Sequence, residues 1–291
     1  MARKEPTQAA QIADEVLAAR EGGPPVLVAT VISAPAAGAA PIGAKMLVRA
    51  DGSRLGRLDG GPLDGAVLAE APDAFRRHGV ETVYVAPGGA RLRRLEAAGR
   101  DSYQVMLEVH ERPATLLVIG GGHVGKALSV IGDLCGFSVA IVDDRPEYAN
   151  RERFPEAADV VCGRFEEVLR DYPIDAGTYI VCVTRGHKHD EESLRRVVGS
   201  PAAYVGMIGS KRRVGAVLQH LVEDGADPQA VARVHTPIGL DIGAETPEEI
   251  AVAIMAEIIQ ARRGGSGRPL RESRKPRPGI APAERLPEPG E

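Results

Sequence analysis

Short apolar runs alternate with segments of helical periodicity from Ala114 to Arg263. The runs are rich in Val and Ile and stop at Gly or a charged residue, as buried parallel strands do. Six strands are predicted, within ATLLVIG, SVAIVDD, ADVVCG, TYIVCVT, AYVGMIG and VARVHTP. Helices are predicted from His123 onward, over Glu166 to Leu169, Asp190 to Val198, Lys211 to Glu223 and Pro247 to Arg263. This alternation predicts an α/β fold, a Rossmann-like doubly wound parallel sheet.

The residues before this region follow a different pattern, in which most predicted strands are not separated by helices. Helices are predicted from Thr7 to Arg20 and, in spite of Pro72, from Leu63 to His78. Asp51 and Gly52 lie between two apolar runs and are a strong hairpin signal. The predicted strands lie within VLVATVIS, KMLVRA, SRLGRL, ETVYVA and YQVMLEV. This part is predicted to be a smaller α+β domain.

Two domains and a tail follow from these patterns. The N-terminal α+β domain is predicted over residues 1–112 and the Rossmann-like domain over residues 113–263. Residues 264–291 are rich in Pro, Gly and charged residues. Such a segment cannot bury a core, so we expect a disordered tail.

Composition and charge exclude several classes of function. The net charge is −4 and the isoelectric point is about 6.0, which argues against a general nucleic-acid binder. The apolar runs are too short for a membrane span. The N-terminal segment contains acidic residues and no apolar stretch of the kind found in secretion signals, so a cytoplasmic location is expected.

The three cysteines are far apart in the sequence. Cys135, Cys162 and Cys182 form no Cys-x-x-Cys pair. This spacing argues against a disulfide scaffold and against a thiolate zinc site. We expect the cysteines to be small buried apolar residues. For Cys162 an exposed position beside a cation is the alternative, because Gly163 and Arg164 follow it at the end of a predicted strand.

The first candidate binding element is a glycine-rich turn. Gly120, Gly122 and Gly125 have the spacing G-x-G-x-x-G between a predicted strand and a predicted helix. Glycines permit a tight turn and a close approach of the backbone, so the N–H groups at the helix start can bind a phosphate. Asp143 ends the next strand, where a carboxylate that binds a ribose is expected, and Arg145 could pair with a phosphate. A solvated strand end is the alternative for these two residues.

A second group of candidates follows the fourth predicted strand. Thr184, His187, His189 and Asp190 should lie at the point where the strand order reverses, facing His123 of the first loop. Hydrogen bonding to a ligand or proton transfer suits the histidines. Capping of a helix by Asp190 is the alternative. No metal is predicted, because two histidines and one aspartate lack a third fixed ligand.

A third group follows the fifth predicted strand. Gly209, Ser210, Lys211 and Arg212 combine a helix start with two cations, which favours an anion site. A basic, solvated helix turn remains the alternative. The Gly-containing loop from Thr236 to Ala244 comes after the sixth predicted strand and carries no assigned role.

Five stretches of the sequence, taken in order, resemble one family. They are MLEVHERPATLLVIGGGHVG, VDDRPEYANRERFPEA, TRGHKHDEESL, YVGMIGSKRR and TPIGLDIGAETPEEIAVAIMAEI. They resemble the XdhC/CoxI accessory proteins, which mature molybdenum hydroxylases such as xanthine dehydrogenase and carbon monoxide dehydrogenase. The resemblance implies a chaperone that binds the molybdenum cofactor, as molybdopterin or its dinucleotide form. It further implies two partners, a cysteine desulfurase for sulfuration and an apo-hydroxylase client.

Two departures from the family pattern affect the first domain. Many members have Gly-Gly-Cys-x-Glu where this chain has Gly60 to Asp64, with Pro62 in the cysteine position. The frequent Ser-x-Pro-Arg is present only as Ala39 to Ile42, without the arginine. A cysteine contact to the cofactor from this domain is therefore not expected, although Lys45 and Asp64 could still contribute.

Other functional classes stay open at this stage. An NAD(P)-dependent oxidoreductase could use the same glycine turn and Asp143. The chain has no Tyr-x-x-x-Lys motif, and its only candidate acid or base groups near the turn are His123, His187 and His189. A nucleotide-sensing regulatory domain is a third class. The resemblance favours a maturation factor over a turnover enzyme, no catalytic residue is assigned, and a homodimer is compatible with the sequence.

Overall fold

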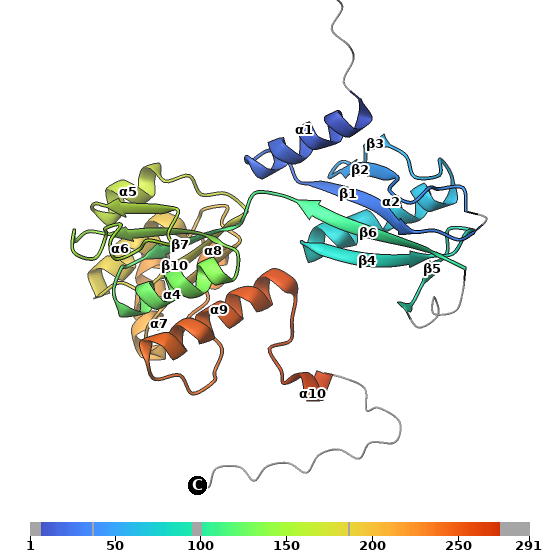
Figure 1. Cartoon of the computed structure of the whole chain (residues 1–291). Helices are drawn as coiled ribbons and strands as arrows, with labels where there is room; N and C mark the ends of the chain where they lie inside the picture. Colours follow the sequence, from blue (N-terminus) through green and yellow to red (C-terminus); the bar gives the residue numbers. More distant parts are fainter. Residues whose placement is uncertain (1–6, 37, 95–100, 186, 274–291) are drawn as a thin grey trace, which may run out of the picture. The chain divides into compact units, whose positions relative to one another are not determined.

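The computed structural model describes residues 7–36, 38–94, 101–185 and 187–273 (Figure 1). The side chains of His187, Lys188, Asp190, Lys211, Arg213 and Ser273 lie outside this description. The chain divides into two compact units, Met1–Thr115 with Gly136–Ser138, and Leu116–Cys135 with Val139–Glu291. No helix in the described ranges is long and apolar enough to cross a membrane.

The first unit is built on an antiparallel sheet, which confirms the expected smaller α+β domain. The sheet has six strands in the order β3-β2-β1-β6-β4-β5. Its elements are α1 (Gln8–Arg20), β1 (Val26–Ser33), β2 (Lys45–Arg49), β3 (Arg54–Gly56), α2 (Pro62–Arg77), β4 (Val80–Val85), β5 (Arg91–Leu92) and β6 (Tyr103–His110). The predicted hairpin joins β2 to β3, and Gly52 in its turn has a φ of +82°, a conformation that glycine adopts without strain.

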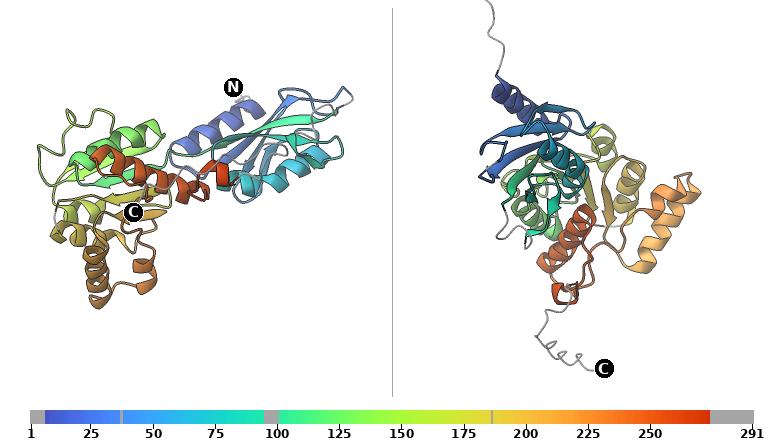
Figure 2. Two further views of the ribbon diagram at one scale, coloured as in Figure 1. Left: turned by 90° about the horizontal axis from the view of Figure 1, so that it is seen from below. Right: turned by 90° about the vertical axis from the view of Figure 1, so that its right-hand side faces the viewer.

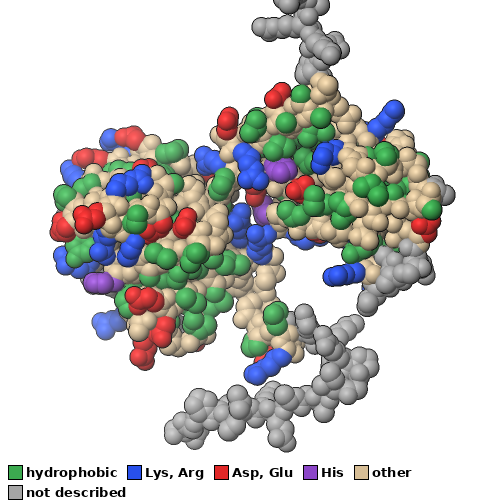
Figure 3. Space-filling view, in the orientation of Figure 1, with side chains coloured by type: hydrophobic (Ala, Val, Ile, Leu, Met, Phe, Trp, Pro, Cys, Tyr) green, Lys and Arg blue, Asp and Glu red, His purple; other side chains and the backbone are tan. Residues whose placement is uncertain are grey.

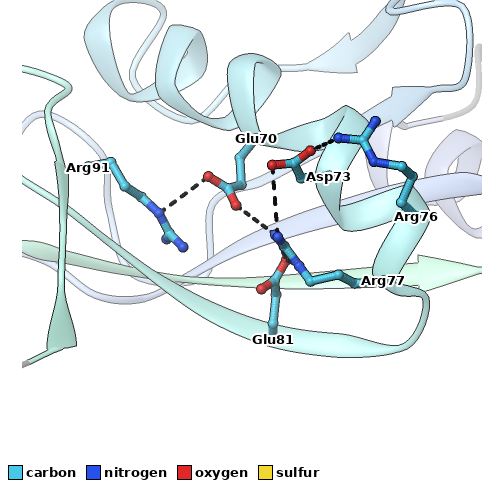
Figure 4. A network of polar contacts seen from close by, with 6 residues as sticks. All are labelled: Glu70, Asp73, Arg76, Arg77, Glu81 and Arg91. Atoms are coloured by element: carbon cyan, nitrogen blue, oxygen red, sulfur yellow. Dashed lines mark hydrogen bonds and ion pairs between the residues drawn. The ribbon is translucent and has the colours of Figure 1, made fainter. Parts of the chain in front are cut away.

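A network of ion pairs ties helix α2 to the edge of this sheet (Figure 4). Arg77 contacts Glu70 at 2.6 Å and Glu81 of β4 at 2.7 Å. Glu70 also contacts Arg91 of β5 at 3.3 Å. Each partly exposed pair stabilises by at most about 1 kcal/mol, so the network fixes the position of the short edge strand more than it adds stability.

A buried carboxylate organises the loop before α2. Asp64 is only 2% exposed and accepts hydrogen bonds from the backbone N–H of Leu58 at 2.8 Å and of Asp59 at 3.2 Å. Arg54 of β3 contacts the other oxygen at 2.7 Å. Asp64 therefore serves the fold of its own loop.

The second unit is a parallel sheet with helices, as the sequence predicts. The sheet has five strands in the order β11-β10-β7-β8-β9, so the order reverses between β7 and β10. The strands are β7 (Thr115–Ile119), β8 (Ser138–Asp143), β9 (Asp159–Cys162), β10 (Thr178–Cys182) and β11 (Tyr204–Met207). The helices are α4 (His123–Leu134), α5 (Phe165–Asp171), α6 (His187–Val197), α7 (Lys211–Glu223), α8 (Pro228–Ala232), α9 (Pro247–Arg263) and α10 (Leu270–Ser273). Helix α10 lies in the predicted tail; residues 274–291 lie outside the described part, so their disorder stays a prediction.

Helices cover both faces of the parallel sheet (Figures 1 and 2). Helices α5, α6, α7 and α8 pack on one face around an aliphatic cluster that includes Leu117 and Ile180. Helix α4 packs close to β7 on the other face and contacts α9. A Cβ on Gly132 would lie 2.6 Å from the side chain of Leu116, which shows how closely α4 approaches the sheet.

Two predictions about this unit are wrong. VARVHTP is not a sixth strand, because Asp227 caps a helix that takes in Val231, and only His235 forms an isolated bridge, to Gly206. Pro237 has no N–H with which to continue a ladder. Helix α6 starts at His187 and not at Asp190. No Gly or Pro separates the two positions, so nothing in the chain stops the helix from extending.

We expect Asp64→Ala to destabilise the first unit by about 2 to 3 kcal/mol, because it leaves buried N–H groups and Arg54 without their acceptor. Urea denaturation followed by circular dichroism measures this change. Asp14→Ala, at an exposed position of α1, is the matched control. Equal stability of the two variants would contradict the structural role of Asp64.

Candidate functional site

The glycine-rich turn connects β7 to α4 as predicted, and its glycines differ in what requires them. A Cβ on Gly125 would lie 2.0 Å from the carbonyl oxygen of Gly120, and one on Gly121 would lie 2.0 Å from that of Tyr148. Gly120 itself has a φ of +115°. A Cβ on Gly122 would meet no atom within 4 Å. The packing of the protein thus requires three of these glycines, whereas the space at Gly122 is open to a ligand.

The start of α4 favours an anion. Gly122 is its N-cap residue and provides no side-chain cap, so no side chain of the cap satisfies the first N–H groups. The positive end of the helix dipole lies at the same place. Helix α9 contrasts with it, because Thr246 and Glu249 form a complete capping box at its start.

The carboxylate of Asp143 binds the backbone of the glycine-rich turn. Its side chain is 1% exposed and accepts a hydrogen bond from the N–H of Gly121 at 2.8 Å. Arg145 donates three more, from its backbone N–H at 3.1 Å, its Nε at 2.9 Å and its Nη2 at 3.0 Å. Four donors occupy the acceptor sites of this carboxylate. The ribose contact stays a prediction; in this arrangement the carboxylate serves the turn.

The pKa of Asp143 reflects these contacts. Burial by itself would raise the pKa, but the hydrogen bonds from Arg145 and Gly121 outweigh it and hold the pKa below the ordinary value of 3.8. The side chain is therefore a carboxylate at neutral pH. A fixed negative charge beneath the turn keeps Arg145 in place.

Two guanidinium groups flank the turn. Arg145 stacks on the ring of Tyr148, with 3.8 Å between its Cζ and the ring centroid. Arg153 donates from Nε to the carbonyl oxygen of Gly121 at 3.0 Å and from Nη2 to that of Gly122 at 3.4 Å. Sequence reasoning did not single out Arg153. The signal was present, since Arg153 lies in the family-like stretch VDDRPEYANRERFPEA.

A pocket of about 140 Å³ lies at the carboxyl ends of β8 and β10. It is lined by Asp143, Asp144, Arg145, Phe165, Thr184, Arg185 and His189. The fold therefore brings Arg145, Thr184 and His189 together. The ring of His189 lies 5.5 Å from that of Phe165, and Arg185 adds a cation that sequence reasoning missed.

A second pocket, of about 400 Å³, lies along α4. It is lined by His123, Lys126, Ala127, Val130, Ile131, Arg153 and Glu248. His123 lines this pocket, and the expectation that it faces the polar stretch after β10 stays a prediction, because most side chains of that stretch lie outside the described residues. His123, Lys126 and Val130 share one face of α4 by helical spacing, and Glu248 of α9 lies on the same pocket.

The remaining candidates are only partly placed. Gly209, Ser210 and Arg212 follow β11 at the same edge of the sheet, but among the described residues they line neither of these two pockets, and Arg212 is exposed. The side chains of His187, Asp190 and Lys211 lie outside the described residues. Within the described part no three His, Cys, Asp or Glu side chains form a group that could hold a metal. The absence of a metal stays a prediction.

The loop from Thr236 to Ala244 is held by Glu257 of α9. Glu257 accepts hydrogen bonds from the hydroxyl of Tyr204 at 2.6 Å and from the N–H of Gly239 at 2.8 Å, and it contacts His235 at 3.2 Å. Burial and this neighbouring carboxylate raise the pKa of Tyr204 far above its usual range. The backbone N–H of Gly239 therefore has a structural role in holding the loop against α9.

The cysteines are less buried than expected. Cys182 is buried as predicted, but Cys135 and Cys162 are exposed. Cys135 caps the end of α4, and Cys162 ends β9, the edge strand of the sheet, so neither reaches the core.

Lys45, a candidate of the first unit, has a partner within that unit. Its ammonium group donates a hydrogen bond to the hydroxyl of Thr30 at 2.8 Å.

Comparison with family models identifies the chain. Residues 116–258 match the XdhC Rossmann domain, and residues 19–85 match the XdhC and CoxI family. The chain belongs to the XdhC and CoxI family. The glycine turn and the residues that line both pockets lie within the XdhC Rossmann domain, whereas Lys45 and Asp64 lie within the other match.

Individual relatives agree with this assignment. The uncharacterized protein YqeB of Escherichia coli (strain K12) is 33% identical over 230 residues, which cover 77% of this chain and 41% of the relative. A protein of Bacillus subtilis (strain 168), named as a probable xanthine dehydrogenase subunit, is 32% identical over 148 residues, or 51% of this chain and 43% of the relative. The chain thus spans about two fifths of the length of these curated relatives.

A solved structure shares the fold. The crystal structure of a xanthine dehydrogenase from Bacillus halodurans, at 2.80 Å resolution, superposes with a TM-score of 0.52. The match covers 87% of this chain and 95% of that chain at 20% sequence identity. At this identity the likeness concerns the fold alone.

We expect Asp143→Asn to destabilise the XdhC Rossmann domain by about 3 kcal/mol at neutral pH, because it leaves the guanidinium of Arg145 without its charge partner. The folded pKa of Asp143 lies below 3.8, so its contribution is complete above that pH and is lost as the pH falls through the lower, folded pKa. Denaturant unfolding of both proteins, measured from neutral to acidic pH, should show a constant difference that shrinks only below about pH 3.8.

Asp159→Asn, at an exposed position at the start of β9, is the control for this series. It should match the parent protein at every pH. A difference between parent and Asp143→Asn that already shrinks near neutral pH would contradict the depressed pKa.

Proposed function

We propose that this chain binds the molybdenum cofactor, supports its sulfuration, and passes it to a molybdenum hydroxylase of the xanthine dehydrogenase type. Membership in the XdhC and CoxI family supports this proposal. The name of the Bacillus subtilis relative, which refers to xanthine dehydrogenase, points to the same client. The cofactor is a cargo here, and the chain acts as a chaperone in the cytoplasm, a location that rests on the sequence alone.

The observation that carries the proposal is the open space at Gly122 beside the start of α4. Molybdopterin carries a terminal phosphate, and its dinucleotide form carries a diphosphate that joins the pterin to a nucleoside. A phosphate seated over Gly122 would accept hydrogen bonds from the N–H groups that open α4. The space that a Cβ would fill is free for it. The residues of the turn therefore fit the anionic end of this ligand.

The two pockets supply contacts for the rest of the ligand. Arg185 lines one pocket beside the ion pair of Arg145 and Asp143. Arg153 lines the other pocket beside Lys126, whose ammonium group pairs with Glu156 at 2.9 Å. These local cations let a protein of net negative charge bind an anion. The small apolar wall of the pocket along α4 would exclude water from the part of the ligand that it covers.

Sulfur transfer in this proposal does not use a thiol of the first unit. Pro62 stands where many family members have cysteine. A cysteine desulfurase partner would supply the sulfur directly to the bound cofactor. The exposed thiols of Cys135 and Cys162 are the ones to monitor for persulfide formation, because exposure is a condition for such chemistry.

We expect Gly122→Val to abolish cofactor binding without unfolding the protein. The valine side chain meets no protein atom at its Cβ but would occupy the space reserved for the phosphate. Anaerobic titration with molybdenum cofactor, followed by absorbance, should show affinity reduced by at least about tenfold, or about 1.4 kcal/mol. A folded variant with unchanged affinity would refute the proposed site.

Two comparisons sharpen this experiment. Gly215→Val, on an exposed position of α7 where a Cβ also meets no atom, should bind like the parent. Parallel titration of the parent with NADH and NADPH tests the oxidoreductase alternative. Tight binding of a dinucleotide together with no binding of molybdenum cofactor would replace the proposed function with that one.

A further inference from the structure

An exposed apolar face runs along two neighbouring helices of the XdhC Rossmann domain. Helices α4 and α9 contact each other. On α4, Val130 is 41% and Leu134 is 80% exposed, and on α9, Val252 is 49% and Ile259 is 40% exposed. Figure 3 shows hydrophobic side chains gathered over the part of this unit where Figure 1 places the two helices. We call these four residues with Ala256 the α4–α9 face.

The face has the periodicity of a helix-packing surface and not of scattered exposure. Val252, Ala256 and Ile259 follow one another at intervals of four and three residues, so they form one stripe along α9. Val130 and Leu134 are four residues apart on α4 and form a second stripe. Such stripes normally pack against another helix. Within the described residues both stripes are exposed, so the face is available to a partner.

Charges at the two ends of α9 are opposite in sign. The exposed Glu248 lies in the first turn of the helix, and the exposed Arg263 lies in the last. The pair Glu248 and Arg263 and the pair Val252 and Ile259 have the same centre, between Met255 and Ala256. If two copies of α9 pack antiparallel about that centre, each glutamate faces an arginine and each valine faces an isoleucine at once.

We infer that the α4–α9 face is the interface of a homodimer, in which α9 of one copy packs antiparallel against α9 of the other. A two-fold axis produces this arrangement, because it brings the same patch of both copies together. Ala256 near the centre is small and lets the helices approach closely. A second copy supplies both the apolar stripe and the complementary charges in a single register. Val130 and Glu248 also line the pocket along α4, so this interface would border the proposed ligand site. The symmetric stripe and charges of α9 support the dimer whichever ligand the glycine turn binds.

The size of the face sets the expected strength. Helix α9 has 17 residues and is therefore about 25 Å long, and two neighbouring helices together are about 20 Å wide. The face then covers on the order of 500 Å² per copy, or about 1,000 Å² for the pair, near the lower limit for a specific interface. We therefore expect a dimer that dissociates at micromolar concentrations, because small interfaces bind weakly.

Sedimentation equilibrium of the full chain, from about 1 to about 100 µM, tests the inference. The parent protein should pass from monomer to dimer in this range. Val252→Glu should weaken the dimer by at least about tenfold, because it buries a charge in the apolar stripe. Leu17→Glu is the matched control: Leu17 is 59% exposed on α1 of the first unit, so this variant should dimerise like the parent.

Charge reversal at the two ends of α9 tests the antiparallel register, with circular dichroism of each variant as the check on folding. Glu248→Arg alone and Arg263→Glu alone should each weaken the homodimer by up to about tenfold, since both symmetric pairs become repulsive. An equimolar mixture of these two proteins should form a heterodimer, and the double variant should dimerise like the parent.

Three results would overturn the inference. A parent protein that remains monomeric at all concentrations would refute the homodimer. A dimer insensitive to Val252→Glu, with the variant folded by circular dichroism, would place the interface elsewhere. Failure of the charge-reversed mixture to recover dimerisation would exclude the antiparallel register.

Discussion

The buried carboxylate of Asp143 fixes the geometry on which the candidate site depends. It ties the end of β8 to the N–H of Gly121 and at the same time holds Arg145. The two adjacent strands and the glycine turn are thereby locked together at one point. A binding turn must keep its N–H groups aligned before the ligand arrives, since any reordering would weaken binding. The charge of Asp143 supplies that order through contacts inside the protein.

The same carboxylate also limits what the site can bind. Four donors already occupy its oxygens, so it has little capacity left for the hydroxyl groups of a ribose. The recognition of a nucleoside at this strand end would have to use Asp144, which is exposed and lines the pocket. The Rossmann-like fold is therefore retained, and the carboxylate at the end of β8 orders the glycine turn, while its contact with a ribose stays a prediction.

The first unit shows a comparable use of a buried carboxylate. Asp64 lies two residues after Pro62, in the segment that departs from the family pattern. Its oxygens are bound by Arg54 and by backbone N–H groups of the preceding loop. These contacts stabilise the loop that precedes α2, and a contact of Asp64 with the cofactor stays a prediction. Both units thus depend on an aspartate that organises backbone N–H groups, and in both the pairing with an arginine offsets the cost of burying the charge.

Local pattern was sufficient to predict most of the fold. Runs of Val and Ile bounded by Gly predicted the parallel strands, and the Asp51-Gly52 pair predicted the hairpin of the first sheet. These signals are carried by neighbouring residues and depend little on the rest of the chain. VARVHTP failed because its apolar residues suit a short helix as well as a strand, and the N-cap at Asp227 favours the helix.

The sequence by itself determined the turn and the order of most elements, because glycine spacing and apolar periodicity are local properties. The family came from the resemblance of whole stretches of sequence and not from these patterns. Only the tertiary structure decided which side chains meet. It placed His123 on the pocket along α4 and brought Arg153 to the carbonyl oxygens of the turn. It also directed hydrogen-bond donors to both carboxylate oxygens of Asp143. Arg153 lies 31 residues from Gly122 in the sequence. Contacts at that separation depend on how strands and helices pack, and no local pattern encodes them.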